Sequence, residues 1–418
     1  MAAKRGGGRI KTVVYLDVLL LTNFLTAYLL LLAAGALSGQ RAPFARMLAG
    51  SALAALSALI LFAPEQPYPV QVAYKAATAL GITAAAFGWR SRRRLVTAAC
   101  WYAALNIAPV SYTHLFTMTL AHRAVGDIRR GGFRQLRNYV DMCATLAKNQ
   151  QQKDFFAYAQ KALQRTDSCY YSLIHRLLDS VDEDRICTVG VNMGFGGLIY
   201  GASELKKQAD LEGQPIAWIT AARCGDERLS ELVPKATGHG SFVWLLDATD
   251  TDPAQVVLLA KANPQSAFGL LADPSALTED CVKALAACRN LVVMPLLQTP
   301  ELTPEVCRAA RRLKAQKMFY VLTVLIDDET AGEVMQDDWL ESMAQETLCC
   351  MCARKPGTSD ETARKLRRSI VNGRLETGKP VLLLDWDGDV RYLNNRISEY
   401  MTFGSVLPEG STFPLQLG

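Results

Sequence analysis

Polar side chains follow the apolar runs in the second half of this sequence, at positions where they could bind a ligand together. The candidates are Asn192, Asp247, Asp273, Asp327 and Asp328. If the runs are parallel strands, their carboxyl ends lie at one edge of a sheet, where α/β proteins bind their ligands. The sequence therefore predicts a polar ligand rim at that edge.

Three glycines lie just beyond Asn192, where a strand is expected to turn into a helix. Gly194, Gly196 and Gly197 would leave backbone amides free at a helix N-terminus, and such amides can bind an anion. A dinucleotide-binding fingerprint needs a further glycine at position 199, which is Ile199. A tight turn between strand and helix explains the same glycines, so both interpretations stay open.

The cysteines and histidines show no metal-binding pattern. Cys349, Cys350 and Cys352 lie close together, but on a strand Cys350 and Cys352 face one side and Cys349 the other. His175 has no second histidine or carboxylate cluster at metal-ligand spacing. We interpret these residues as core or surface positions and predict no metal and no cofactor. The 11 cysteines are irregularly spaced, which is typical of reduced thiols.

The elements that would position the rim begin at Arg185, where short apolar runs alternate with helix-length segments. Helix starts are expected at Asp252-Pro253, Thr278-Glu279 and Thr303-Pro304, because each places a capping side chain before a first turn. Apolar strands separated by helices predict a parallel sheet, either an open or partial α/β barrel or a doubly wound sheet. The expected strands are 186–192, 216–220, 242–247, 267–272, 291–297, 319–326, 347–353 and 381–386.

The first quarter of the chain has a different composition. It contains four apolar blocks, each close to the roughly 20 residues that cross a bilayer. The blocks are 13–37, 47–63, 70–89 and 95–112. Residues 117–181, by contrast, have the apolar spacing of soluble helices. The sequence therefore predicts three parts: a membrane domain of about four helices at 1–112, a helical segment at 113–184 and an α/β domain at 185–418.

The charges of the first quarter predict an orientation. Arginines lie in the first and third loops between the blocks, and the second loop has no basic residue, so loops one and three are expected in the cytoplasm. These arginines account for much of the net charge of +5, so no nucleic-acid partner is predicted. Asp17 and Lys75 fall at matching depth in the first and third blocks. They either pair directly or reach the membrane surface separately.

Several short motifs occur in order along this first quarter. They are YLDV (15–18), LLTNF (20–24), LFAP (61–64), Lys75 and FGWRSRRR (87–94). In this order, over about residues 11–108, they resemble the membrane domain of the sporulation sigma-E factor processing peptidase family. The resemblance implies a multi-pass protein of the bacterial cell membrane with aspartic-type endopeptidase activity. It also implies the lipid bilayer and a pro-sigma factor as partners, together with self-association.

Beyond about Ala108 the resemblance is expected to end. The Asp-Ser-Gly or Asp-Thr-Gly turn that carries the catalytic carboxylate of the family does not occur anywhere in the sequence. Asp250-Thr251-Asp252-Pro253 is interpreted as a helix N-cap and Asp387-Gly388-Asp389 as a hairpin turn, so no catalytic residue is identified. The chain is therefore predicted to lack peptidase activity. Residues 109–115 resemble a peptide translated from sequencing-adapter DNA, as at a junction of two genes. An ordinary end of the fourth helix at Pro109 explains the same residues, so both interpretations stay open.

The C-terminal part is similar in layout, and only in layout, to radical-SAM-type barrels. Those enzymes hold an iron–sulfur cluster on a Cys-x3-Cys-x2-Cys motif after the first strand, whereas residues 191–201 contain no cysteine. Two alternative functions follow. One is a degenerate barrel of this type on a membrane anchor, and the other is a membrane interaction protein without catalysis.

Overall fold

The computed structural model describes residues 16–40, 42–57, 68–89, 91–107, 109–146, 150–164, 169–374, 380–397, 401–407 and 413–415. The chain forms two compact units, residues 1–113 and 114–418. Each unit has a hydrophobic core of its own.

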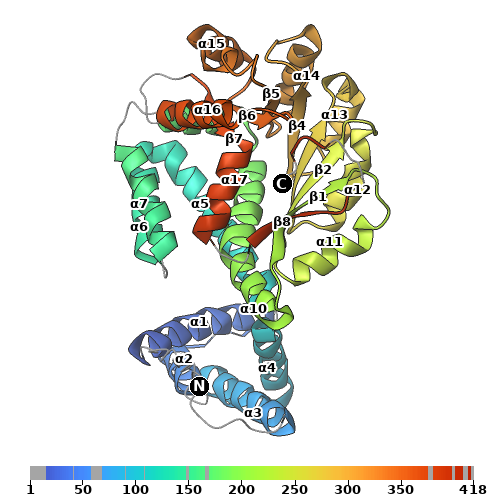
Figure 1. Ribbon diagram of the computed structural model, residues 1–418. Helices are drawn as coiled ribbons and strands as arrows, with labels where there is room; N and C mark the ends of the chain where they lie inside the picture. Colours follow the sequence, from blue (N-terminus) through green and yellow to red (C-terminus); the bar gives the residue numbers. More distant parts are fainter. Residues whose placement is uncertain are drawn as a thin grey trace, which may run out of the picture. The chain divides into compact units, whose positions relative to one another are not determined.

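The first unit consists of helices that pack through small side chains. They are α1 (Leu16–Leu37), α2 (Phe44–Ser57), α3 (Tyr68–Phe87) and α4 (Arg92–Ile107) (Figure 1). Their shared core is rich in alanine and is closed around Leu31, Ile82 and Tyr102. At Gly50 a Cβ would lie 3.0 Å from the Cβ of Ala86, so this glycine allows α2 and α3 to approach closely.

Large apolar side chains also point outward from this unit. Phe44 is 67% exposed and Trp89 is 74% exposed, and Leu29, Leu53 and other apolar residues are exposed as well. Within the described residues, one continuous helix, Glu183–Glu212, has the length and composition to cross a membrane. It belongs to the second unit. Shorter apolar helical stretches, including Thr26–Gly35 and Ala77–Phe87, lie in the first unit.

Four helices lead into the α/β part of the second unit. They are α5 (Pro109–Gly131), α6 (Phe133–Leu146), α7 (Gln150–Gln164) and α8 (Cys169–Ser180). Arg129 of α5 forms an ion pair with Glu183, with 2.5 Å between Nη1 and Oε2. Arg176 of α8 donates to the carbonyls of Pro380 and Ala344, at 2.6 Å each. These contacts attach α5 and α8 to the α/β fold.

The centre of the second unit is an eight-stranded parallel sheet that forms a half-barrel (Figure 1). The strands are β1 (Ile216–Arg223), β2 (Val243–Ala248), β3 (Ala267–Ala272), β4 (Leu291–Leu297), β5 (Leu322–Ile326), β6 (Cys349–Arg354), β7 (Leu382–Asp385) and β8 (Met401–Ser405). Their order is β7-β6-β5-β4-β3-β2-β1-β8. Strands β1 to β7 therefore follow chain order without the central reversal of a doubly wound sheet, and the partial-barrel prediction is confirmed.

The outer face of the sheet is covered by the helices that connect the strands. They are α11 (Leu229–Gly238), α12 (Val256–Ala262), α13 (Glu279–Leu285), α14 (Pro304–Ala315), α15 (Asp337–Glu346) and α16 (Asp360–Gly373). Trp244, Phe268 and Val293 pack beneath the first four of these helices. The expected caps are confirmed, because Asp252, Thr278 and Thr303 each accept a hydrogen bond from a first-turn amide.

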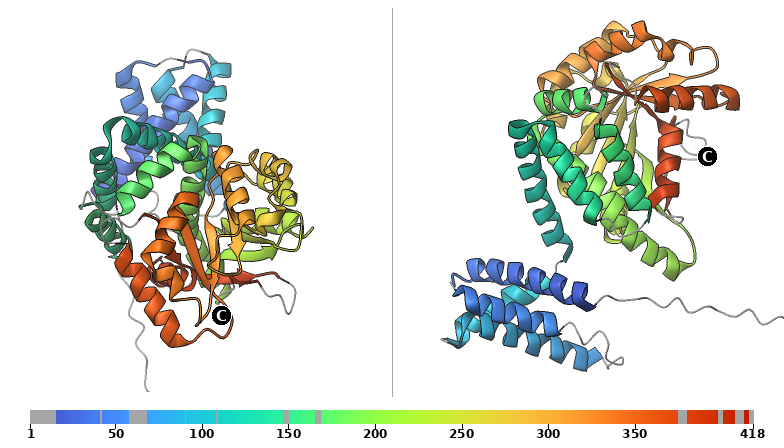
Figure 2. Two further views of the ribbon diagram at one scale, coloured as in Figure 1. Left: turned by 90° about the horizontal axis from the view of Figure 1, so that it is seen from above. Right: turned by 90° about the vertical axis from the view of Figure 1, so that its left-hand side faces the viewer.

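The inner face is covered by a different set of helices. Leu205 of α10 (Ala202–Glu212) and Trp386 of α17 (Trp386–Ile397) pack with inward-facing residues of the sheet. The two views of Figure 2 show α8 to α10 on the opposite side of the strands from α11 to α14. The indole of Trp386 donates to the carbonyl of Leu415 at 2.9 Å, so residues 413–415 also belong to this core.

Two sequence predictions are wrong in this unit, and one strand was not predicted. The expected strand 186–192 is helical, as α9 (Glu183–Gly190) followed by the π-helix η2 (Val191–Gly201). Asp182 caps this helix and two acidic residues occupy its first turn, which outweighs the β-branched composition of the run. Asp387-Gly388-Asp389 is the first turn of α17 instead of a hairpin, and the strand β8 was not expected.

Candidate functional site

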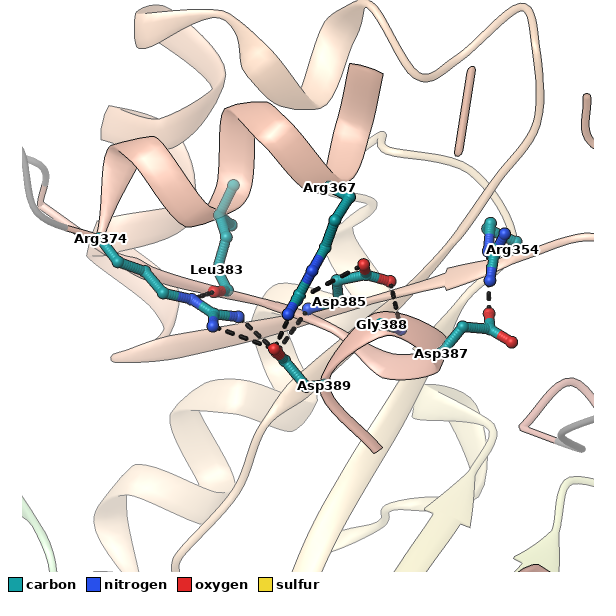
Figure 3. A network of polar contacts seen from close by, with 8 residues as sticks. All are labelled: Arg354, Arg367, Arg374, Leu383, Asp385, Asp387, Gly388 and Asp389. Atoms are coloured by element: carbon teal, nitrogen blue, oxygen red, sulfur yellow. Dashed lines mark hydrogen bonds and ion pairs between the residues drawn. The ribbon is translucent and has the colours of Figure 1, made fainter. Parts of the chain in front are cut away.

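The densest group of charged side chains lies where β6 and β7 end and α17 begins. We call it the rim cluster: Arg354, Arg367, Arg374, Asp385, Asp387 and Asp389 (Figure 3). Arg354 ends β6, Asp385 ends β7, and the other two aspartates occupy the first turn of α17. Arg367 comes from α16 and Arg374 is the C-cap of that helix, seven residues later and therefore on the same face.

Asp389 is the centre of the rim cluster. Its carboxylate accepts from Nη1 and Nη2 of Arg374, with 3.0 Å from Nη1, and from Arg367 Nη1 at 2.5 Å. The amide of Asp385 also donates to it at 3.0 Å. Burial by itself raises the pKa of Asp389, but the two arginines hold that pKa below its ordinary value.

The pKa of Asp385 is shifted in the opposite direction. It is 4% exposed, accepts from the Gly388 amide at 3.2 Å and lies 3.6 Å from Arg367 Nη1. Burial raises its pKa above the ordinary value of a carboxyl group despite Arg367. One guanidinium therefore lies between two carboxylates whose pKa values move apart.

Three further carboxylates near this edge, Asp387, Asp327 and Asp328, also have partners. Arg354 Nε donates to Asp387 at 2.9 Å, and Lys355 Nζ lies 2.7 Å from Asp327. The Lys355 and Thr330 hydrogen bonds hold the pKa of Asp327 well below its usual range. Asp328 accepts from the Ser359 hydroxyl at 2.7 Å.

The rim cluster has the chemistry of an ion-pair network. An aspartic peptidase needs two carboxylates that share one proton around a water molecule. Here Arg367 occupies the space between Asp385 and Asp389, and the cation stabilises the ionised form of its nearest carboxylate. No group of three or more metal-ligating side chains occurs among the described residues either. The arrangement ties α16 to β7 and α17.

The structure separates the residues that were predicted to form the ligand rim. Asp247 is the second-last residue of β2 and Asp273 follows the end of the neighbouring β3, but each accepts hydrogen bonds from its own turn, Asp247 from Thr249 and Asp273 from Ser275. Asn192 lies elsewhere. It is fully buried in η2, and its amide donates at 2.9 Å to the carbonyls of Pro264 and Ser266, which precede β3.

The glycines beyond Asn192 belong to the π-helix, where backbone amides bond to carbonyls within the helix. A Cβ at Gly197 would lie 3.1 Å from Val243 Cγ2, and one at Gly196 would lie 3.5 Å from the ring of Phe242. Gly194 has nothing within 4 Å. Gly197 therefore allows close packing of the helix on β2, whereas a methyl group at Gly196 would make an ordinary van der Waals contact. The expected turn with free amides is not present at these positions.

The cysteine interpretation is confirmed for the strand β6. Cys350 and Cys352 are buried in the core beneath α15 and α16, and Cys349 faces the other side of the sheet. Burial raises the pKa of Cys349 to about 12, so this thiol is protonated and unreactive at neutral pH.

The intramembrane pair is not tested, because the side chains of Asp17 and Lys75 lie outside the described part of the structure. Their pairing stays a prediction. The rim cluster, in contrast, was missed from the sequence. The sequence features that could have predicted it are the DWDGD motif after an apolar run and two arginines seven residues apart in the preceding helical segment.

Comparison with known families identifies the N-terminal segment. Residues 13–165 match the family model described as sporulation factor SpoIIGA, which supports the resemblance found in the motifs of the first quarter. The match covers about a third of the chain and runs well past Ala108, so the expectation that the family pattern ends there is wrong. Neither a curated protein nor a solved structure matches the chain.

Proposed function

We propose that this chain acts in sporulation sigma-factor processing at the bacterial cell membrane, as a protein that docks the pro-sigma factor without cleaving it. The observation that carries the proposal is the family match of residues 13–165. The SpoIIGA family acts on a pro-sigma factor at a membrane, and the matched segment includes the helices of the first unit.

The first unit supports a multi-pass membrane location. Its helices are joined by small residues inside, while leucine, phenylalanine and tryptophan side chains point outward. Exposure of these apolar side chains to water would cost free energy, whereas in a bilayer they would contact the apolar lipid chains. The orientation with loops one and three in the cytoplasm belongs to the same proposal.

The second unit supports the absence of catalysis. The family's Asp-Ser/Thr-Gly turn does not occur in the sequence, and the rim carboxylates of the described residues are paired with arginine, lysine or backbone donors. Loss of the shared proton removes the general acid–base step of peptide hydrolysis. Docking, which needs only binding contacts, remains.

Co-expression with a membrane-bound pro-sigma substrate tests both halves of the proposal. We expect the substrate to co-purify with the chain and to keep its full-length mobility on a gel. A shortened product that disappears when one aspartate of residues 114–418 is changed to alanine would overturn the absence of catalysis. Failure of the substrate to co-purify, with the chain correctly inserted, would overturn docking.

The half-barrel favours a second candidate, a degenerate radical-SAM-like domain on a membrane anchor. Its parallel strands and inward-facing helices suit ligand binding, although the segment after Val191 has no cysteine to hold a cluster. Iron and sulfide in stoichiometric amounts in the purified protein would favour this function. The family match over residues 13–165 spans residues 109–115 and does not favour a junction of two genes there, and a sequencing read across codons 105–120 tests this.

A further inference from the structure

The two faces of the half-barrel differ in how completely they are covered. On the outer face, Val293 of β4 and Cys350 of β6 are fully buried beneath helices. Their inward-facing neighbours Val292 and Met351, together with Leu384 of β7, are only half-buried although they lie in the interior of the sheet. Side chains at the concave face therefore border a space that protein atoms do not fill.

This space is a cavity of about 510 Å³. Its volume lies in the roughly 300–1,000 Å³ range of pockets that hold small molecules. Ile219 of β1, Val243 of β2, Met294 of β4 and Leu384 of β7 all line it, so it extends across most of the sheet. A long apolar cavity fits a flexible hydrocarbon chain better than a compact polar ligand.

The polar end of the cavity lies where α8, α14 and α15 end. Asp179, Lys314 and Gln345 are the exposed polar lining residues at these helix ends. The acidic groups there already have partners, because Asp179 lies 2.9 Å from His175 and Glu346 accepts from the Cys307 thiol. Lys314 Nζ has neither an ion pair nor a hydrogen bond with any described residue, so its ammonium group is available to an anionic ligand at this end of the cavity.

We propose that the half-barrel binds a long-chain fatty acid, with the acyl chain in the cavity and the carboxylate beside Lys314. The acyl chain would bury apolar surface against Val292, Met351 and Leu384, which border the unfilled space. Apolar side chains around a void lose dispersion contacts, and the loss grows with the volume of the void. A fatty acid restores those contacts, while its head group meets the unpaired ammonium.

Photolabelling of the full chain in amphipathic polymer tests this site. The probe is palmitic acid carrying a diazirine in its chain, and the labelled peptides are identified by mass spectrometry. We expect label on peptides of β4, β6 or β7 that excess palmitate removes. Label confined to residues 16–107, or label that palmitate does not displace, would overturn the proposal.

Two pairs of variants test where the acyl chain and the carboxylate of the fatty acid bind. Val292→Phe fills the cavity and should abolish the labelling, whereas Leu258→Phe on the exposed face of α12 should leave it unchanged. Lys314→Glu should weaken palmitate binding roughly tenfold, the scale of one charged hydrogen bond, and Lys235→Glu on the exposed face of α11 should not. A diazirine analogue of hexadecanol should bind both lysine variants equally. Equal palmitate binding by the two lysine variants would refute the assigned head-group position, and unchanged labelling in Val292→Phe would refute the cavity.

Discussion

Asp385 and Asp389 show how a few ångströms change the chemistry of one residue type. Both are on the segment that joins β7 to α17, and both contact Arg367. Asp389 also accepts hydrogen bonds from two nitrogens of Arg374. Asp385 is more deeply buried, and its contact with Arg367 is longer, at 3.6 Å. The pKa of Asp389 is therefore lowered and that of Asp385 is raised.

We predict that Asp389→Asn lowers the free energy of unfolding by about 3 kcal/mol, because it leaves two partly buried guanidinium groups without their anion. Arg374 is 12% exposed, so water replaces the lost partner poorly. The measurement is urea unfolding followed by the fluorescence of the buried Trp218, Trp244 and Trp386. Glu361→Gln removes an ion pair that is exposed on both sides and should leave the unfolding midpoint nearly unchanged. Equal losses in the two variants would contradict a buried network.

The two aspartates should also give opposite pH dependences. Because the folded pKa of Asp389 is lowered, its stabilising effect is present above the unfolded pKa and is lost as pH falls through the folded pKa. The folded pKa of Asp385 is raised, so its effect is fully present below the unfolded pKa and is lost as pH rises through the folded pKa. From pH 3.5 to pH 7, Asp389→Asn should thus fall further behind the parent chain while Asp385→Asn gains on it. Parallel curves for the two variants would contradict this assignment.

Among the elements, the π-helix η2 depends most on single glycines. A Cβ at Gly201 would lie 2.3 Å from the carbonyl oxygen of Gly240, which is backbone and cannot rotate away. In Gly196 and Gly197 the same helix presents bare backbone to Phe242 and Val243. The helix can therefore keep its present position only while Gly201 carries no side chain, and Gly197 allows it a close contact with Val243.

We predict that Gly201→Ala destabilises the second unit by about 1–3 kcal/mol, because the helix must move away from the Gly240 backbone. Gly194→Ala is the matched control in the same helix. Nothing lies within 4 Å of its new methyl group, so it should be neutral or raise stability by about 0.5–1 kcal/mol through helix propensity. Thermal unfolding of both variants measures the difference. Similar melting temperatures would show that the helix has room at Gly201.

Most strands of the sheet could be predicted from the sequence. The prediction failed where an apolar run at the margin of the sheet forms a helix instead. Runs such as 267–272 and 291–297 are apolar throughout and flanked by turn residues, so their strands match the prediction. Run 186–192 has a similar composition, but the Asp182 cap and the acidic first turn favour a helix. The rim cluster was not predictable in this way, because Arg367 meets Asp389 only once α16 lies over β7.

For the molecule as a whole, the orientation of the first unit in the membrane can be tested. Six arginines lie in loops one and three or in the first turn of the helices that follow them, and no basic residue lies in loop two, so we predict loop two outside and the other loops in the cytoplasm. A cysteine introduced at Gln66 should react with an impermeant thiol reagent added to intact cells, and one at Ser91 should not. The native Cys100 must be replaced by serine first. The reverse labelling pattern would refute the orientation.

The position of β8 in the sheet has a consequence for the order of folding. Ile219 of β1 pairs with Val243, 24 positions along the chain, whereas Ile216 pairs with Met401, 185 positions along. Closing the longer loop costs about 2 kcal/mol more chain entropy, by the logarithmic dependence on loop length. Strands β1 to β7 can therefore assemble one neighbour at a time while β8 joins late. Until then β1 is an open sheet edge, so partly folded chains are exposed to pairing with one another during synthesis.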